Sequence, residues 1–343
     1  MSPPEPGAGA GLDLLVAGDC NPDVLVLGRD VTPAFGQQEK LVDGIWLVIG
    51  GSAAITAVAA ARLGLRVALA AAVGDDPAGE FMLAQLAAEG VDVAAVMVRA
   101  GVPTGMTVAL SRGDDRAILT APGAVASLTA ADIPRALLAR ARHLHVSSYF
   151  LLADSLGPGL ADLLAGARAV GATTSLDTNW DPSGRWRDER LSAAIAEVDL
   201  LLPNEAEALR LTGATTLDTA LRALRAPAPP APGEAFAVAG TPSVVVKLGE
   251  RGAMCADETG WYRVSLPPVV PVDTTGAGDC FDAGVIAGLL NGCALPGAAG
   301  LGCATGALST GAPGGTGGAP DLAHASELAR LVTIAAAGVT ARE

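Results

Sequence analysis

The sequence predicts an α/β fold, in which a mostly parallel central sheet lies between two layers of helices and a small separate β-sheet forms a lid. From residue 127 onward, helical patterns and short apolar strands alternate regularly. Repeated strand–helix units of this kind produce a parallel sheet that is covered on both faces. Two strand-rich intervals, at about 22–48 and 94–122, interrupt the alternation, and we expect them to form the lid.

We expect a single domain over residues 12–335, with a disordered tail at 1–11. The chain has 343 residues, enough for one large α/β domain with a small appendage. The glycine-rich end of the tail precedes a predicted strand instead of following one, so it does not fit a dinucleotide-binding fingerprint.

Apolar runs bounded by turn residues predict the strands, and longer alanine-rich patterns between them predict the helices. In chain order, the expected strands lie at 12–18, within 21–35, and at 44–50, 66–74, 143–147, 173–177 and 199–202. The clearest expected helices lie at 50–64, 76–89 and 129–142.

The composition argues against two classes of partner. The formal net charge is −14 at pH 7, which disfavours binding to nucleic acid or to an anionic membrane surface. No charged residue occurs from 283 to 320, but turn residues break this segment into apolar runs shorter than the roughly 18 residues that suggest a membrane span. We expect two buried helices and a glycine loop there.

The five cysteines include no C-x-x-C pair, and no N-terminal signal sequence is evident. We therefore expect a reduced, cytoplasmic protein. His143 and His145 lie in an apolar strand-like run, for which a structural role is favoured over a zinc site.

A glycine turn at 276–278 directly precedes Asp279 and an apolar helix. Backbone N–H groups converge at such a turn, and the start of a helix adds partial positive charge, so the pair can form an anion hole. Phosphoryl transfer needs this charge stabilisation and a carboxylate that accepts the proton of the acceptor hydroxyl. A helix cap alone would explain the same residues, so the motif by itself leaves both interpretations open.

Other phosphate-binding designs are absent from the sequence. A Walker A loop requires a lysine after glycine, but the two lysines, Lys40 and Lys247, follow Glu39 and Val246. No G-x-G-x-x-G follows a predicted strand and opens a helix, which excludes the usual nicotinamide-binding site.

The segment DTTGAGDCFDAG, at 273–284, resembles the C-terminal signature of the ribokinase-like, PfkB-type carbohydrate kinase family. The N-terminal signature is present in outline at 50–64 and 73–92. Further matching segments are PTG at 103–105, SLDTNWDP at 175–182, LLPNEAEAL at 201–209 and VVVKLGERGAM at 244–254. Their order and spacing match the family from about residue 13 to 335, so the resemblance implies a ribokinase-like fold and a kinase that uses ATP and Mg²⁺.

The resemblance implies a catalytic role for the glycine turn and the carboxylate that follows it. Asp279 matches the catalytic base that deprotonates the sugar hydroxyl. Gly276, Ala277 and Gly278 match the residues whose N–H groups face the γ-phosphate.

The resemblance also implies sites for cations. Asn204 and Glu207 match the N-x-x-E motif, which organises Mg²⁺ and phosphates largely through water, as suits a cation that dehydrates reluctantly. A helix cap explains this pair as well, and both roles can hold at once. Asp273 and Thr275 lie where some relatives hold a monovalent cation such as K⁺, although a turn-stabilising role is equally open.

For the nucleotide, the resemblance points to two further segments. Lys247, Gly249 and Gly252 match the turn beside the ATP phosphates and ribose, where glycine permits close approach of the backbone. The stretch from Cys303 to Gly314 corresponds to the helix and loop that border the adenine.

On the acceptor side, the segment GDCNPDVLV resembles the one that leaves the first strand of the family, where an acidic residue binds sugar hydroxyls. Asp23 is therefore the expected substrate ligand, with Asn21 second. Gly50 and Gly51 would let the backbone approach the sugar.

Asp177 and Asn179 match the family's D-x-N-x-R pattern and are expected at the floor of the cleft. Two positions depart from the family. Ile55 stands where many sugar-binding relatives have Asn, which removes one hydroxyl contact. Asp181 stands where several relatives carry Arg, which weakens the case for an acidic sugar.

The leading hypothesis is an ATP-dependent sugar kinase, in which the lid excludes water from the γ-phosphate. Two alternatives stay open: a nucleoside kinase of the same fold, and a non-catalytic kinase homologue with a binding role. The expected partner is a small-molecule sugar, and relatives often form a homodimer through the lid. The sequence identifies neither the sugar nor the hydroxyl.

Overall fold

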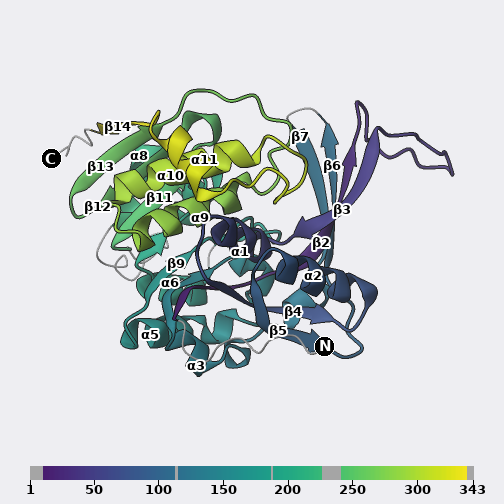
Figure 1. Cartoon of the computed structure of the whole chain (residues 1–343), viewed down its shortest axis with the longest axis horizontal. Coiled ribbons are helices and arrows are strands. Elements are labelled where there is room, and N and C mark those ends of the chain that lie inside the picture. Colours follow the sequence, from purple (N-terminus) through teal and green to yellow (C-terminus); the bar gives the residue numbers. More distant parts are fainter. Residues whose placement is uncertain (1–10, 113–114, 187, 226–240, 338–343) are drawn as a thin grey trace.

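The computed structural model describes residues 11–112, 115–186, 188–225 and 241–337 (Figure 1). The expected disordered tail therefore lies, except for Gly11, outside the described residues.

The large sheet is mostly parallel, as predicted. Its order is β14-β13-β12-β11-β10-β9-β8-β1-β4-β5. Neighbouring strands from β5 to β11 pair in parallel, whereas β11 to β14 pair antiparallel. The strands are β1 (Leu12–Ala17), β4 (Val67–Gly74), β5 (Asp92–Arg99), β8 (Ala141–Val146), β9 (Thr173–Leu176), β10 (Leu200–Leu201), β11 (Ser243–Lys247), β12 (Ala253–Asp257), β13 (Gly260–Ser265) and β14 (Thr333–Ala336).

Helices cover both faces of this sheet (Figure 1). Side chains of β1 alternate between the two cores, because successive residues of a strand point to opposite faces: Leu15 and Ala17 pack in one core, Leu14 and Val16 in the other. The first core includes helices α5 (Gly157–Ala169), α6 (Glu189–Ala196), α7 (Glu205–Thr212) and α8 (Leu217–Arg225). The second includes α1 (Ser52–Arg62), α2 (Pro77–Ala88), α9 (Ala277–Leu290), α10 (Leu295–Ser309) and α11 (Leu322–Ala329), with β10 to β13 packing on α9 and α10 in an adjoining cluster.

The charge-free segment forms two closely packed helices, as predicted. A Cβ at Gly284 in α9 would lie 2.8 Å from Cα of Gly302 in α10, and one at Gly288 would lie 2.8 Å from Cα of Ala298. Glycine at both positions lets the two backbones approach each other. Within the described residues, no helix combines the length and the apolar character needed to cross a membrane.

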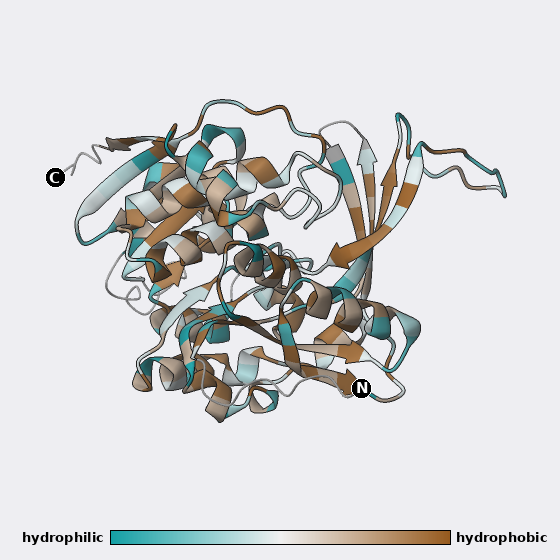
Figure 2. Ribbon diagram, in the orientation of Figure 1, coloured by the Kyte–Doolittle hydropathy of each residue, from teal (hydrophilic) through white to brown (hydrophobic). Residues whose placement is uncertain are grey.

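The small sheet has the order β3-β2-β6-β7 and lies to one side of the body (Figure 1). Its strands are β2 (Asn21–Leu27), β3 (Gly44–Gly50), β6 (Met106–Arg112) and β7 (Asp115–Ala121). Figure 2 shows hydrophobic residues along β2 and β3. We call this sheet the lid.

The structure corrects two predicted boundaries. The expected lid interval 94–122 is too long, because residues 94–99 belong to β5, which pairs in parallel with β4 in the large sheet. The expected helix at 129–142 is also wrong: a short 3₁₀ turn, Ala130–Asp132, is followed by the four-residue helix α3 (Arg135–Leu138) and then by β8. Pro134 explains this break, because the residue before a proline is disfavoured in the helical region.

His143 and His145 lie in β8 with both ring nitrogens bonded to hydroxyl groups. The partners of His143 are Thr173 and Ser175, at 2.7 Å each. His145 contacts Ser175 at 2.7 Å and Ser147 at 2.8 Å. These four hydrogen bonds agree with the structural role predicted for the two histidines.

Candidate active site

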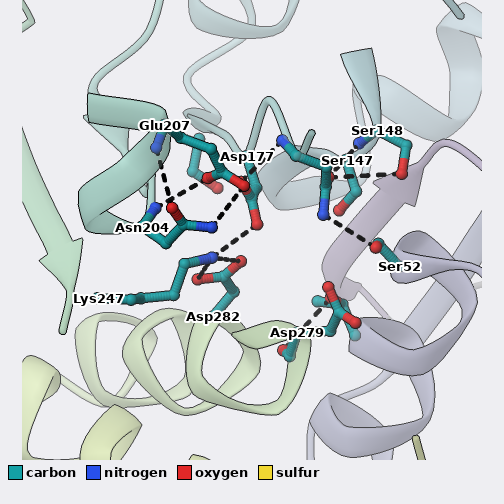
Figure 3. A network of polar contacts seen from close by, with 12 residues as sticks. Ser52, Ser147, Ser148, Asp177, Asn204, Glu207, Lys247, Asp279 and Asp282 are labelled. Atoms are coloured by element: carbon teal, nitrogen blue, oxygen red, sulfur yellow. Dashed lines mark hydrogen bonds and ion pairs between the residues drawn. The ribbon is translucent and has the colours of Figure 1, made fainter. Parts of the chain in front are cut away.

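Several of the predicted site residues lie after strands that end at one edge of the large sheet. Asn21 follows β1, Asp177 and Asn179 follow β9, Asn204 follows β10, and Lys247 ends β11. The carboxyl ends of parallel strands meet at the same edge, where ligands of open α/β sheets usually bind. Figure 3 shows the polar network that results.

The glycine turn requires glycine at Gly276. This residue has φ 70° and is the N-cap of α9, and a Cβ there would lie 2.6 Å from Cα of Gly315. Ala277 N–H donates to the carbonyl oxygen of Thr274 at 3.3 Å, a long hydrogen bond. The first turn of α9 thus presents its N-terminal amides next to Asp279, because the first N–H groups of a helix have no partner within it.

Asp279 is buried in this first turn. Burial raises its pKa to about 7, and the negative charges of Asp177 and Asp19 add to the effect, while Lys247 and a hydrogen bond from Ser52 oppose it. A general base works best when its pKa lies near the working pH, so this environment suits proton transfer at neutral pH.

Lys247 is held by two buried carboxylates. Its Nζ lies 2.6 Å from Oδ2 of Asp177 and 3.0 Å from Oδ2 of Asp282 (Figure 3). Burial alone would lower the pKa of Lys247, but Asp177, Asp282 and Glu207 outweigh it and raise that pKa. Sequence reasoning missed Asp282; its signal was a carboxylate three residues after Asp279 in an otherwise apolar helix.

Asp177, Asp279 and Asp282 bring carboxylate oxygens within 4.8 Å of one another. Oxygen atoms of this kind are the ligands that Mg²⁺ takes in proteins. The donor set therefore fits a hard divalent cation, although Asp177 and Asp282 are both paired with Lys247.

Asn204 and Glu207 form a reciprocal cap at the start of α7. Oδ1 of Asn204 accepts from Glu207 N–H at 2.9 Å, and Oε2 of Glu207 accepts from Asn204 N–H at 2.8 Å. Nδ2 of Asn204 also donates to Oε1 of Glu207 at 2.6 Å. Burial, with Asp177 nearby, raises the pKa of Glu207 to about 8. The capping role considered from sequence is present.

The acceptor side places Asn21 and Asp23 on β2, at the junction of body and lid. Asn21 Nδ2 donates to Oδ1 of Asp23 at 3.1 Å and to Oγ1 of Thr107 on β6 at 3.2 Å. Burial raises the pKa of Asp23 to about 7, with further contributions from Asp19 and Asp279. The charge of Asp279, the expected base, thus acts on Asp23, the expected substrate ligand, although 256 residues separate them in sequence (279 − 23).

Asp19 was not predicted as a site residue. Its carboxylate accepts from the N–H groups of Ser52 and Ala53, at 3.0 Å each, and so caps α1 from outside the helix. Gly51 makes this possible: it has φ 83°, and a Cβ there would lie 2.8 Å from the carbonyl oxygen of Asp19.

Asn179 adopts φ 54°, a left-handed conformation that asparagine tolerates better than most residues. Its Oδ1 accepts from Ser148 N–H at 2.6 Å, and its Nδ2 donates to Ser52 Oγ at 3.0 Å. Asp181 instead closes its own loop, accepting from the N–H groups of Ser183 at 2.8 Å and Trp186 at 2.6 Å.

Asp273 braces the glycine turn against the loop after α10. Its Oδ1 accepts from Thr275 N–H at 3.0 Å and from Thr275 Oγ1 at 2.8 Å, and its Oδ2 accepts from Gly314 N–H at 2.8 Å. Both carboxylate oxygens therefore stabilise local structure.

The remaining expected nucleotide residues differ in their surroundings. Gly249 begins a 3₁₀ turn and Gly252 follows it, with φ 60° and 82°. A Cβ at Gly252 would lie 2.1 Å from the carbonyl oxygen of Val264. Cys303, on α10, is buried in a hydrophobic cluster with residues of β10 to β13 and α9.

A lid residue that sequence reasoning missed reaches the glycine turn. Nη1 of Arg116, on β7, donates to Oγ1 of Thr275 at 3.3 Å. No sequence motif marks Arg116, because only the tertiary fold brings the lid to the turn.

Comparisons with known proteins relate the chain to sugar kinases. Residues 13–322 match the family described as pfkB family carbohydrate kinase. The chain is 32% identical over 287 residues to 2-dehydro-3-deoxygluconokinase from Bacillus subtilis (strain 168), covering 79% of this chain and 83% of that relative. It is 32% identical over 248 residues to a fructokinase from Klebsiella pneumoniae, covering 70% of this chain and 76% of that relative.

A solved fructokinase from Vibrio cholerae O395, with fructose, ADP and calcium ion bound, shares the fold. The TM-score is 0.72 at 26% sequence identity, covering 92% of this chain and 99% of that chain. The predicted three-layer ribokinase-like fold with a small separate sheet is thereby confirmed.

Proposed function

Since the chain belongs to the pfkB family of carbohydrate kinases, which are phosphotransferases with an alcohol acceptor, we propose that it is an ATP-dependent sugar kinase with Asp279 as its general base. The main support is the position of this buried carboxylate, in the first helical turn after the glycine turn. There it can accept a proton beside backbone amides that stabilise negative charge.

In the proposed reaction, the acceptor oxygen forms a bond to the γ-phosphorus while the bond from that phosphorus to the β-phosphate oxygen breaks. Asp279 takes the proton of the acceptor hydroxyl. The N–H groups of Gly276, Ala277 and Gly278 face the charge that develops on the transferred group, where the helix dipole also favours negative charge.

We propose Mg·ATP as the phosphoryl donor. Asn204 and Lys247 lie at the ends of β10 and β11, and Gly249 and Gly252 lie in the turn between β11 and β12. The nucleotide would extend there from the glycine turn. Glu207 would hold Mg²⁺ through water, and the Vibrio cholerae fructokinase, solved with ADP and calcium ion, is a precedent for a divalent cation. When bound, Mg²⁺ neutralises phosphate charge.

We propose two further features of the nucleotide side. Gly314 and Cys303 border the adenine through the backbone of their segment, since the side chain of Cys303 is buried. Asp273 and Thr275 are the candidate ligands of a monovalent cation, to be tested by the dependence of turnover on K⁺.

We propose further that the acceptor is an uncharged sugar. Burial and the charges of Asp19 and Asp279 already raise the pKa of Asp23, so a negatively charged acceptor beside these carboxyls would add repulsion. At position 181, where several relatives carry an arginine, this chain has an aspartate, which would not bind an acidic sugar. The carboxylate of Asp181 accepts hydrogen bonds from its own loop. Asn21, Asp23, Asp177 and Asn179 provide the polar atoms for hydroxyl groups, and Gly50 and Gly51 provide backbone access.

The lid is the proposed surface of a homodimer. Large apolar side chains on β3 and β7 are exposed: Ile45, Trp46, Leu47, Ile118 and Leu119. Exposed large apolar side chains are candidates for an association surface. A cytoplasmic location is proposed from the five cysteines, all of which are free, as expected in a reducing compartment.

The function is tested by measuring ADP release with a panel of pentoses, hexoses, keto-deoxy acids and nucleosides. We expect turnover with a neutral sugar, and about a 100- to 10,000-fold loss in Asp279→Asn with ATP binding retained. Asp218→Asn, at an exposed position in α8, is the matched control. Near-normal turnover in Asp279→Asn would overturn the assigned base, and preference for a keto-deoxy acid would overturn the proposed acceptor class.

A further inference from the structure

The glycine turn contacts the loop that joins α10 to α11, residues 310–321. A Cβ at Gly276 would lie 2.6 Å from Cα and 2.8 Å from the carbonyl oxygen of Gly315 in this loop. The N–H group of Asp273 also donates to the carbonyl oxygen of Thr310 at 3.1 Å. The position of the loop therefore affects the position of the backbone of the turn.

Arg62, the last residue of α1, binds the same loop. Its Nη1 donates to the carbonyl oxygens of Thr316 at 2.5 Å and of Ala319 at 3.1 Å. Its Nε and Nη2 donate to the two carboxylate oxygens of Glu89, at the end of α2, at 2.8 and 2.7 Å. One guanidinium thus ties the loop to the ends of two helices, and Thr316 directly follows the residue that contacts the glycine turn.

Helix α1 contacts both this loop and the start of α9. A Cβ at Gly315 would lie 2.3 Å from Cδ1 of the buried Ile55. Oγ1 of Thr56 donates to the backbone carbonyl oxygen of Asp279 at 3.3 Å. Glycine at position 315 thus lets the loop fit between α1 and the glycine turn, because this residue adjoins both Ile55 and Gly276.

We propose that Arg62 is a positioning residue of the anion hole: by holding the loop in place, it fixes Gly276 and the amides that follow. This inference rests on the proposed kinase function. Backbone amides stabilise developing charge only when they are already in place for it. Half of residues 310–319 are glycine, and glycine has the most conformational freedom in the chain. The conformation of this loop therefore depends on contacts from outside it.

An arginine is suited to this role. Hydrogen bonds from a charged donor to a carbonyl oxygen are stronger than those between neutral groups. The fork of five N–H donors serves several acceptors at once, and the charge persists at every physiological pH. Because Glu89 binds Nε and Nη2 while the loop binds Nη1, the ion pair and the loop contacts can be removed separately.

The test measures ADP release by Arg62→Met and Arg62→Lys with the best acceptor of the panel, at a temperature well below the unfolding of each variant. Arg62→Met keeps an unbranched apolar chain but removes both bonds to the loop. We expect its kcat to fall about 10- to 100-fold, because a misplacement of about 1 Å can cost this much. The KM of the sugar should change little, since Asn21 and Asp23, its expected ligands, lie on β2. Arg62→Lys should recover part of the loss, because an ammonium can still donate to a carbonyl oxygen.

Glu89→Gln is the matched control, with thermal unfolding measured for every variant. It removes the carboxylate that pairs with Arg62 but leaves the guanidinium with its two bonds to the loop. Both Glu89→Gln and Arg62→Met lose the ion pair and its contribution to stability, but only Arg62→Met loses the loop contacts. Only in Arg62→Met should kcat fall, and general destabilisation would not produce this difference.

Normal kcat in Arg62→Met, with wild-type turnover present, would overturn this inference alone. An equal fall of kcat in Glu89→Gln would also overturn it, because Arg62 would then act only through the stability of α1 and α2. Where Arg62→Met does not fold, the comparison passes to Arg62→Lys, and a kcat equal to that of Glu89→Gln would have the same meaning. Absence of wild-type turnover with every acceptor would overturn the proposed function and this inference with it.

Discussion

A side chain at Gly50 would occupy the position of the Asp23 carboxylate: a Cβ built there would lie 1.9 Å from Oδ1 of Asp23. The two residues lie on adjacent strands, β3 and β2, at the end of the lid nearest the body. Gly50 therefore does more than expose backbone to a ligand. It leaves room for the carboxylate that we assign to the acceptor.

We expect Gly50→Ala to displace Asp23 and weaken acceptor binding. The KM of the sugar should rise about tenfold, equivalent to the loss of one hydrogen bond to a charged group, while the affinity for ATP stays within a few-fold of wild type. Gly166→Ala is the control, because Gly166 lies within α5 and a Cβ there meets nothing within 4 Å. An unchanged KM in Gly50→Ala would contradict the role of Asp23.

A pH profile tests the environment of Asp279. Its pKa is raised to about 7, and the base works only when ionised, so kcat/KM should fall as the pH decreases below about 7. At subsaturating substrates, kcat/KM reports the free enzyme. Asp19→Asn removes a carboxyl whose charge raises the pKa of Asp279, so its acid limb should move to lower pH, even if its kcat/KM is lower throughout. An acid limb near the ordinary pKa of aspartate in the wild type would contradict the raised value.

We expect Lys247 to stabilise the folded protein, in addition to its proposed role in nucleotide binding. Lys247→Met leaves Asp177 and Asp282 without their shared partner, and breaking a buried ion pair in this way costs about 3–5 kcal/mol. The loss in the free energy of unfolding should be larger at pH 8 than at pH 5, because the two carboxyls can be neutralised by protonation at lower pH.

The second lysine of the chain provides the control for this change. Lys40 pairs with the exposed Asp30 in the segment between β2 and β3, and exposed ion pairs contribute little. Urea unfolding of Lys40→Met should match wild type, and Lys247→Met/Asp282→Asn should be more stable than Lys247→Met. Equal stability of Lys247→Met and Lys40→Met would contradict the buried triad.

The sequence alone was sufficient to locate those parts of the site whose residues are close together in sequence. The glycine turn with Asp279, and Asn204 with Glu207, are each encoded within a few residues, because the first turn of a helix is set by its own sequence. The alternation of strands and helices was likewise sufficient for the parallel sheet.

The residues that sequence reasoning missed depend on tertiary contacts. Asp19 caps a helix that begins more than thirty residues later, with its partners at Ser52 and Ala53, and Arg116 meets Thr275 across the cleft. Asp282 stands out in the sequence as a carboxylate in an apolar helix, but only the tertiary fold brings it to Lys247. Boundaries failed where one residue overrode a pattern, as at Pro134, or where a strand such as β5 joined the large sheet and not the lid formed by the strands that follow it.

The buried histidines of β8 should make the protein less stable in mild acid. Burial lowers the pKa of His143 to about 3 and that of His145 to about 4, from 6.5. Their folded-state pKa values are below the unfolded value, so the stability they contribute is present above pH 6.5 and is lost as the pH falls toward 4.

For His145→Gln, the decrease in the free energy of unfolding between pH 7 and pH 5 should be smaller than in wild type by about 2 kcal/mol. Urea unfolding at the two pH values measures this, with His324→Gln as the control, because His324 is exposed in α11. Equal decreases in wild type and His145→Gln would show that His145 titrates alike in the folded and unfolded states.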